Sequence, residues 1–154
     1  MHIRRALSAD LPALLPLIEA YWRFEQIGGF AAGRIETLLS GLLAEPQRGT
    51  LWVAEVDGAV AAYLLAVYVF SLEQQGLTAE IDEFYVSPAQ RGQGIGASLL
   101  AVAEAEFRRL GCTSVALQLA RDNAAARAFY RRQQFVARSG YELLDKRLLP
   151  ALAP

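Results

Sequence analysis

Residues 91–96 read Arg91-Gly92-Gln93-Gly94-Ile95-Gly96 and lie between a predicted strand and a predicted helix. At such a junction successive backbone N–H groups point toward one place, and the dipole of the following helix favours negative charge there. Glycine also lets the backbone take positive φ angles and approach a ligand closely. The turn therefore predicts a binding site for a diphosphate group.

Two other phosphate-binding patterns share glycines with this turn. Gly92, Gly94 and Ala97 match the GxGxxG/A pattern of dinucleotide-binding folds. That pattern usually follows the first strand of its fold, whereas several predicted strands precede it here. A P-loop requires a Lys and a Ser or Thr directly after its glycines, and this sequence lacks that pair. The order of the elements therefore argues against both alternatives.

The chain before the turn predicts antiparallel strands and two helices. Apolar alternation and β-branched runs predict strands over residues 2–6, 50–56, 59–70 and 78–86. Asp57-Gly58 is typical of a tight hairpin between two of them. Helical spacing of apolar residues predicts helices over 11–22, with Ser8 or Asp10 as N-cap, and over 33–44. Pro16 lies inside the first helix, where it predicts a kink or a late start.

The chain after the turn predicts two helices, a strand and a closing hairpin. An apolar stripe from Ile95 to Leu110 predicts a helix that ends at Gly111. A strand over 113–119, a helix over 123–133 and a hairpin of strands 135–138 and 141–148 follow. The predicted fold class is α/β, more narrowly α+β. We expect a central mixed, mostly antiparallel sheet of about six or seven strands, flanked by about four helices.

Two separated motifs resemble the GNAT superfamily of N-acetyltransferases. The first runs from Ile81-Asp82-Glu83-Phe84-Tyr85-Val86-Ser87-Pro88 into residues 90–96, and the second is Asn123-Ala124-Ala125-Ala126-Arg127-Ala128-Phe129-Tyr130, followed by Phe135. Their order and spacing agree with that family, as does the order of the expected elements over nearly the whole chain. The resemblance implies the GNAT fold, one N-acetyltransferase domain over residues 1–154, and direct transfer of acetyl from acetyl-coenzyme A to a primary amine.

The resemblance also implies where coenzyme A binds. The glycine turn would hold the diphosphate, and the pantetheine arm would pair with a splayed strand near Phe84 to Val86. Asn123 should cap its helix, and the resemblance adds a contact to the pantetheine arm. Arg91, Arg127 and Arg131 are candidates for the phosphates, with solvated helix-face arginines as the alternative. The implied cofactor-binding set is Phe84, Tyr85, Val86, Arg91, Gly92, Gln93, Gly94, Ile95, Gly96, Asn123 and Arg127.

Three residues are candidates for catalysis. A primary amine is mostly protonated at neutral pH, so attack on a thioester needs a base. The resemblance implies Asp82 as the first candidate, acting directly or through water, and Glu83 as the second. Neighbouring strand residues face opposite sides, so only one should reach the site unless a bulge intervenes. The resemblance implies Tyr130 as the acid that meets the leaving sulfur, and a packing role is its alternative.

The predicted acceptor is a small cationic amine, at a site formed by the first helices. Tyr21, Trp22, Phe24 and Glu25 combine aromatic faces with an acid, which suits a cation, although aromatic residues there could also be core. Asp82-Glu83 before an aromatic pair looks most like the polyamine and small-amine branch of the family. A protein N-terminus or lysine, or a coenzyme A sensor without turnover, remain as alternatives.

One position departs from the family pattern. Gln134 stands before Phe135, where the resemblance implies a glycine at the left-handed cap of the last helix. A residue with a Cβ there costs about 1 kcal/mol.

Composition and charge predict one globular domain with an uneven charge distribution. The 154 residues are 54% hydrophobic and predict one domain. Residues 1–87 carry 5 arginines and 11 acids, whereas residues 88–154 carry 10 basic residues and 5 acids, so the first part suits a cation and the second an anion.

The sequence also gives expectations for the binding partners and the cellular location of the protein. The apolar run 59–70 is too short to span a membrane. We expect no membrane or nucleic-acid partner, and a homodimer stays open. The N-terminus lacks an apolar signal and the single Cys112 can form no internal disulfide, so we expect a cytoplasmic protein. No cluster has metal-ligand spacing, and we expect no metal.

Overall fold

The computed structural model describes residues 1–149, in two compact units divided after Gln118. The larger unit holds one sheet of five strands in the order β1-β2-β3-β4-β5. These strands are β1 (His2–Arg5), β2 (Gly49–Val56), β3 (Ala59–Ser71), β4 (Gly76–Val86) and β5 (Ser114–Leu117). The first four pair antiparallel, and β5 runs parallel to β4. The predicted mixed, mostly antiparallel sheet is confirmed, with five strands in place of six or seven.

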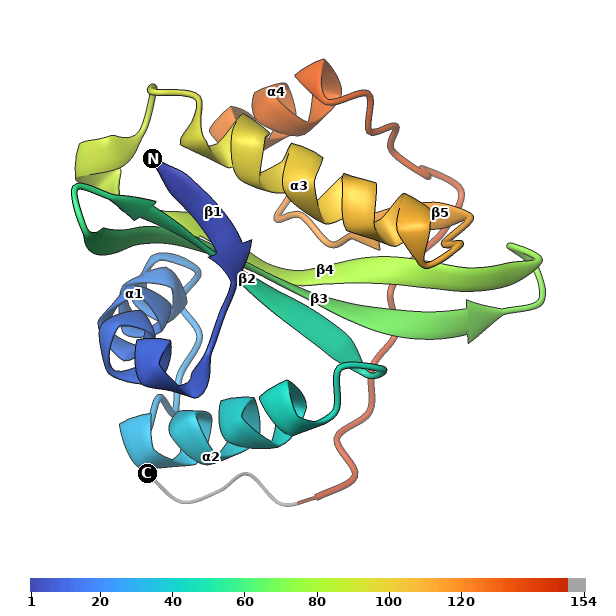
Figure 1. The fold of residues 1–154 in the computed structure, drawn as a ribbon. Helices are drawn as coiled ribbons and strands as arrows, with labels where there is room; N and C mark the ends of the chain where they lie inside the picture. Colours follow the sequence, from blue (N-terminus) through green and yellow to red (C-terminus); the bar gives the residue numbers. More distant parts are fainter. Residues whose placement is uncertain (150–154) are drawn as a thin grey trace. The chain divides into compact units, whose positions relative to one another are not determined.

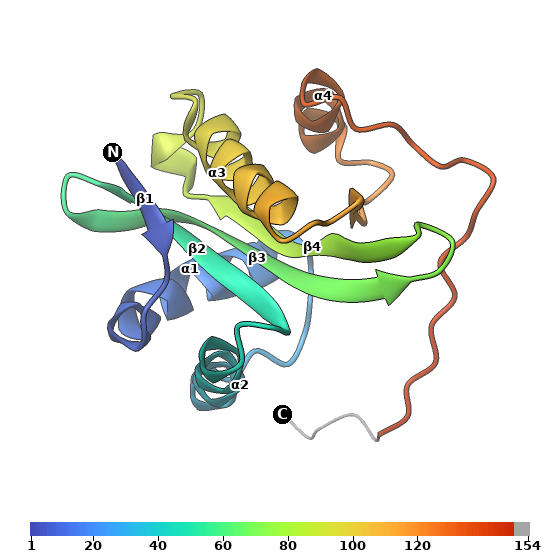
Figure 2. The same ribbon diagram turned by 45° about the vertical axis from the view of Figure 1, so that its right-hand side comes forward.

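Helices cover both faces of this sheet (Figures 1 and 2). Two of them, α1 (Leu11–Phe24) and α2 (Ala32–Ala44), lie on one face, and α3 (Ile95–Arg109) lies on the other. Alternate residues of β2 therefore pack against helices on opposite faces of the sheet. Leu51 and Val53 join the core beneath α1 and α2. Trp52 packs edge-on against Phe107 of α3, with ring centroids 5.7 Å apart.

Most of the local predictions in this unit are confirmed. Asp57 and Gly58 have φ angles of 52° and 79°, as a tight hairpin turn requires. Gly111 follows α3 with φ of 78°. Pro16 does not delay α1, which begins at Leu11. Short 3-10 turns, η1 (Ser8–Asp10) and η2 (Pro88–Gln90), precede α1 and the glycine turn.

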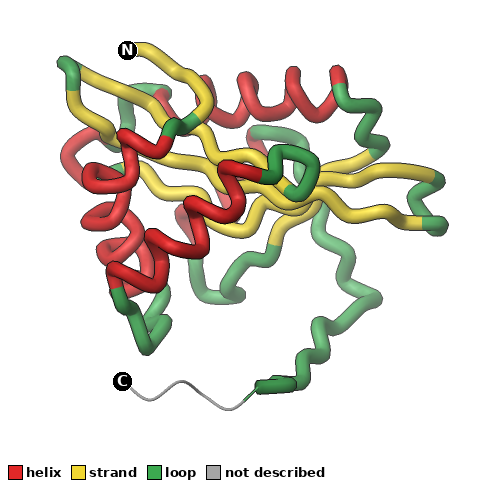
Figure 3. Tube along the Cα trace, turned by 60° about the horizontal axis from the view of Figure 1, so that its bottom comes forward, coloured by secondary structure: helices red, strands yellow, loops and turns green. Residues whose placement is uncertain are grey.

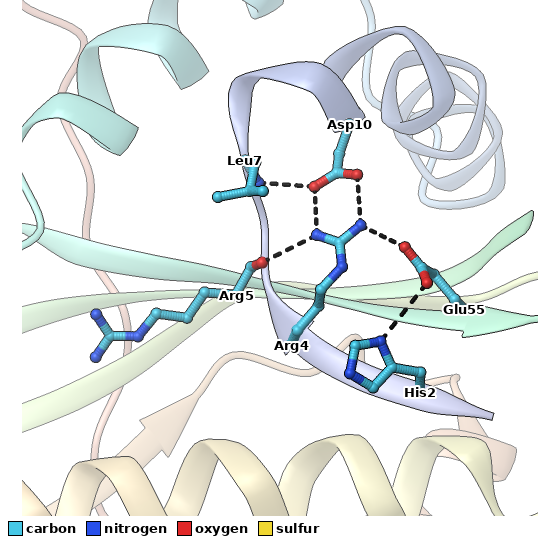
Figure 4. Close-up of polar contacts among 6 residues, drawn as sticks. All are labelled: His2, Arg4, Arg5, Leu7, Asp10 and Glu55. Carbon is cyan, nitrogen blue, oxygen red and sulfur yellow. Dashed lines mark hydrogen bonds and ion pairs between the residues drawn. The ribbon is translucent and has the colours of Figure 1, made fainter. Parts of the chain in front are cut away.

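A cluster of charged side chains ties the start of α1 to the sheet (Figure 4). Arg4 of β1 donates to both carboxylate oxygens of Asp10, at 2.6 and 2.8 Å, and also contacts Glu55 of β2. Asp10 accepts a further bond from the backbone N–H of Leu7 at 2.7 Å. Asp10 therefore occupies the N-cap position of α1, but its side chain binds Arg4 and Leu7 and does not cap the helix.

The smaller unit contains α4 (Ala124–Arg132). The predicted cap is confirmed, because Oδ1 of Asn123 accepts from the N–H of Ala126 at 3.0 Å. Gln134 has φ of 67°, so the left-handed conformation expected after this helix is present in a residue other than glycine. Phe135 N–H then bonds to the carbonyl of Tyr130 at 3.0 Å, which closes the helix end.

The predicted closing hairpin is wrong. Residues 135–138 and 141–148 form no strand, and the chain that leads toward the C-terminus is drawn as loop in Figure 3. Val136, Leu144 and Leu148 are 87%, 85% and 86% exposed, so no apolar face is buried. An alternating apolar pattern favours a strand only where the strand pairs with a neighbour and other elements cover one of its faces. A hairpin that stands alone is at best marginally stable in water.

Candidate active site

A bulge in β4 sets the directions of the two candidate bases. Leu65 of β3 pairs with Glu83, and the next pair is Ala66 with Ile81, so Asp82 is an extra residue on β4. Without a bulge, Ile81 and Glu83 would face the same side. The extra residue instead puts Glu83 on the face of Leu65, which carries α1 and α2. This bulge is the exception under which neighbouring strand residues need not face opposite sides.

The bulge also coincides with the end of the parallel ladder. The last pair between β4 and β5 joins Ile81 to Leu117, whereas β4 itself runs on to Val86. β5 ends at Leu117, so β4 has no strand paired along this edge beyond Ile81 among residues 1–149, and the splayed strand near Phe84 to Val86 that the resemblance implied stays a prediction. A strand edge of this kind is a template for an extended ligand.

Glu83 is held by two hydrogen bonds from different elements. Trp22 of α1 donates its indole N–H to Oε1 at 2.6 Å, and Tyr63 of β3 donates its hydroxyl to Oε2 at 2.8 Å. Burial raises the pKa of Glu83, the two hydrogen bonds oppose that rise, and the charge of Asp82 adds to it. The carboxyl is thus both oriented and made more basic, which suits proton transfer.

Asp82 has a different environment. Its side chain is exposed, and among residues 1–149 it makes no hydrogen bond. Loss of hydration beside the strand, followed by the charge of Glu80, raises the pKa of its carboxyl. Asp82 therefore shares the raised basicity of Glu83 but lacks a fixed orientation.

Aromatic side chains from α1 gather next to Glu83. The ring centroids of Tyr21 and Tyr85 are 6.1 Å apart, and those of Tyr63 and Tyr85 are 6.4 Å apart. Trp22 meets Phe30 edge-on at 5.7 Å. Tyr21 and Trp22, predicted for the acceptor site, are thus brought to the candidate bases.

Arg91 lies over two of these aromatic rings. Its guanidinium carbon is 5.8 Å from the ring centroid of Phe24 and 5.5 Å from that of Tyr85, and its Nε donates to the carbonyl of Val86 at 3.0 Å. The end of α1, the end of β4 and the start of the glycine turn therefore meet at Arg91. Glu25 is the residue directly after α1, and its carboxylate takes no part in this cluster.

Two residues of this cluster were missed from the sequence. Tyr63 is fully buried in an otherwise apolar stretch of β3, and its hydroxyl was the one signal that a polar partner must exist. Phe30 follows two glycines and carried no distinguishing signal.

The glycine turn contains two glycines in the left-handed conformation directly before α3. Gly92 and Gly94 have φ angles of 79° and 80°, and a Cβ added to either would meet no atom within 4 Å. Glycine is therefore required there by the backbone conformation and not by lack of space. At the start of α3, within the described chain, no side chain caps the helix and no acid lies in the first turn. Ile95 is buried and anchors the turn to the core.

The remaining candidates lie in the smaller unit. Tyr130 packs against Phe129 and Phe135, with centroids 5.2 and 5.3 Å away. Arg127 donates to the carbonyl of Arg121 at 2.8 Å and so closes the loop before α4. Arg131 is exposed on the same helix.

Residues 1–149 hold neither a metal cluster nor a membrane-spanning helix. No group of three or more His, Cys, Asp or Glu side chains could hold a metal ion there. No helix in that range has the length and apolar character needed to cross a bilayer. Burial raises the pKa of the Cys112 thiol, which disfavours the nucleophilic thiolate.

The chain is similar to known acetyltransferases in sequence and in fold. The acetyltransferase (GNAT) family profile matches residues 14–135. An uncharacterized N-acetyltransferase of Archaeoglobus fulgidus is 30% identical over 135 residues, covering 86% of this chain and 91% of that protein. An integron cassette protein from the Cole Harbour Salt Marsh metagenome has a TM-score of 0.84 at 26% identity, covering 97% of this chain and 92% of that one. A predicted acetyltransferase with acetyl-CoA from Clostridium acetobutylicum has a TM-score of 0.78 at 18% identity, covering 94% and 95%.

Proposed function

The chain belongs to the GNAT family and is an acyl-CoA-dependent N-acetyltransferase, and we propose that its acceptor is a small molecule with a cationic primary amine. The observation that carries this proposal is the Glu83 carboxylate beside the rings of Trp22 and Tyr63, with Tyr21 and Tyr85 packed next to them. An ammonium group is attracted both by a carboxylate and by aromatic faces. The surplus of acids in residues 1–87 supports the same charge preference.

Proton transfer in the proposed reaction begins at the acidic pair. Glu83 or Asp82 takes a proton from the ammonium, directly or through water, so that the amine nitrogen gains a free electron pair. The nitrogen attacks the thioester carbonyl carbon and then releases its second proton to solvent as the C–S bond breaks, and the base returns its own proton to solvent. By the family resemblance, Tyr130 donates a proton to the leaving thiolate and regains one from solvent. The net products are the N-acetyl amine, coenzyme A as thiol and one proton.

Binding of acetyl-coenzyme A is assigned to main-chain groups. The turn from Gly92 through Gln93, Gly94 and Ile95 to Gly96 would direct its N–H groups to the diphosphate, because these groups and the α3 dipole favour an anion. Phe84, Tyr85 and Val86 would offer the strand edge to the pantetheine arm.

Charged and capping side chains have a secondary part in this binding. Arg91 and Arg127 would have to leave the carbonyls of Val86 and Arg121 before they could bind phosphate. Asn123 is proposed to contact the pantetheine arm in addition to its cap. Because the two family motifs lie on either side of Gln118 in the sequence, we propose that residues 1–154 act as one catalytic domain.

The test is release of coenzyme A thiol from acetyl-coenzyme A in the presence of an amine panel. The panel holds polyamines, small monoamines, and peptides with a free N-terminus or a lysine. Stimulation by the small cationic amines supports the proposal. Preference for the peptides would overturn the acceptor class in favour of a protein acetyltransferase. Binding of coenzyme A without thiol release on any amine would indicate a sensor.

A further inference from the structure

We propose that Trp22 and Tyr63 are positioning residues that hold the Glu83 carboxylate as the proton acceptor of the reaction, and that Asp82 is not the base. This inference rests on the proposed acetyl transfer and assigns the base within it. The hydrogen bonds at 2.6 Å from Trp22 and 2.8 Å from Tyr63 carry it.

The two donors fix both oxygens of the carboxylate. They come from α1 and β3, so the carboxylate plane is held between two separate elements. The donors are themselves held, since Trp22 packs edge-on against Phe30 and Tyr63 is fully buried beside Tyr85. Each carboxylate oxygen keeps lone-pair capacity beyond its one bond. An amine proton can therefore be accepted without breaking either hydrogen bond.

Both donors favour the charged form of Glu83. An indole N–H can only donate. The Tyr63 hydroxyl keeps its proton because burial, and then the charge of Glu83, raise its pKa far above the ordinary value. These bonds oppose the rise in the pKa of Glu83 that burial causes.

Other titratable groups act on this carboxyl and on its donor. Asp82 of β4 raises the pKa of Glu83 by its charge, while Tyr21 of α1 and Tyr85 of β4 raise the pKa of the Tyr63 hydroxyl that donates to it. Arg91 lies beyond them, over the ring of Tyr85 at 5.5 Å. Asp82 therefore tunes the basicity of Glu83 through its charge, whereas its own exposed carboxylate has no side chain of residues 1–149 to orient it.

A titration by NMR tests the contact without requiring activity. The chain has two tryptophans, so its spectrum holds two indole N–H signals. Trp52 is buried against Phe107 and serves as the internal reference. We expect the Trp22 signal, assigned with Trp22→Phe, to shift with pH as Glu83 ionises. Glu83→Gln should abolish that shift, and Asp82→Asn should keep it with a midpoint at lower pH. A Trp22 signal that does not respond, or that still responds in Glu83→Gln, overturns the inference.

The pH profile of kcat/KM tests the catalytic part. Loss of either donor raises the pKa of Glu83, so Tyr63→Phe and Trp22→Phe should move the acidic limb to higher pH and lower kcat/KM about tenfold at neutral pH. Tyr68→Phe is the matched control, because Tyr68 lies on the same strand and its hydroxyl pairs with Thr50 at 2.8 Å.

The outcomes separate this inference from the proposed function. If Asp82→Asn removes the acidic limb while Tyr63→Phe leaves it in place, Asp82 is the base and the inference fails. If the unmodified protein acetylates no amine, the proposed function fails, and the base assignment fails with it. The NMR titration still reports the Glu83 contact in that case.

Discussion

Arg4 and Asp10 form two parallel hydrogen bonds, at 2.6 and 2.8 Å, between β1 and the start of α1. Asp10 is only 9% exposed, so its charge depends on this partner. Two parallel bonds to one guanidinium fix orientation as well as distance. The pair therefore holds α1, and with it Trp22, in place against the sheet.

Asp10→Asn is expected to lower the free energy of unfolding by about 2 kcal/mol, because the neutral amide replaces a carboxylate that takes two bonds from Arg4, and Glu55 alone then faces that charge from β2. Chemical denaturation of both proteins measures the difference. Glu19→Gln is the control, since the Glu19–Arg23 pair is exposed on α1 and should change stability little. An equal effect of the two substitutions would contradict this role of Asp10.

The contribution of Asp10 should also depend on pH. The hydrogen bonds from Arg4, the largest cause, keep the pKa of Asp10 below its ordinary value in the folded protein. A carboxyl with a lowered folded pKa stabilises above its unfolded pKa, about 3.9, and loses that contribution as pH falls through the folded value. The stability gap between the unmodified protein and Asp10→Asn should therefore be constant near neutral pH and shrink in acid. A gap that widens in acid would contradict the linkage.

Gln134→Gly is expected to stabilise the protein by about 1 kcal/mol. Gln134 has φ of 67°, a conformation that strains a residue with a Cβ but suits glycine. Thermal unfolding measures the effect. Gln133→Gly is the control, because Gln133 has φ of −88° and should lose stability instead.

Gly94→Ala is expected to weaken coenzyme A binding about tenfold, since φ of 80° disfavours alanine and relaxation would turn N–H groups away from the diphosphate. Calorimetry with coenzyme A measures the affinity. Gly41→Ala within α2 is the matched control, because Gly41 has no positive φ and no nearby atom to clash. It should leave affinity unchanged and raise stability by about 0.5–1 kcal/mol.

Tyr130→Phe is expected to lower kcat by roughly 10² if its hydroxyl donates a proton to the leaving thiolate. Steady-state thiol release measures the rate, and coenzyme A affinity should stay the same. Tyr141→Phe is the control, because Tyr141 is 66% exposed and stacks with Arg138. An unchanged rate in Tyr130→Phe would remove Tyr130 from the mechanism.

Local signals predicted the elements that hold the candidate site. Some features depend only on residues that are close in sequence, and sequence spacing was enough to predict them. These are the Asp57-Gly58 turn, the apolar stripe of α3 and the glycines at 92 and 94. The closing hairpin failed for the opposite reason. Its apolar alternation indicated strands, but a strand also needs a paired edge and a covered face, which sequence spacing does not report.

The interior of the candidate site could be predicted only in part. Asp82 and Glu83 were found as a pair, but the distinction between them depends on one extra residue in the β3–β4 ladder. Tyr63 lies 20 residues before Glu83, and their contact depends on the register of two strands. Pairing register is a tertiary property, so periodicity in one strand could not reveal it.

The extra residue at Asp82 reverses the alternation of side-chain directions between the first and second halves of β4. Odd-numbered side chains before it, such as Ile81, face the α3 layer, while odd-numbered ones after it, Glu83 and Tyr85, face the α1 layer. Deleting Asp82 would make Ile81 and Glu83 neighbours in a regular ladder, with Ile81 still opposite Ala66 and Glu83 still opposite Leu65, so Glu83 would keep its direction toward Trp22 and Tyr63. A one-residue deletion at Asp82 should therefore be tolerated better than one elsewhere in β4, where the alternation is regular and a missing residue shifts its frame.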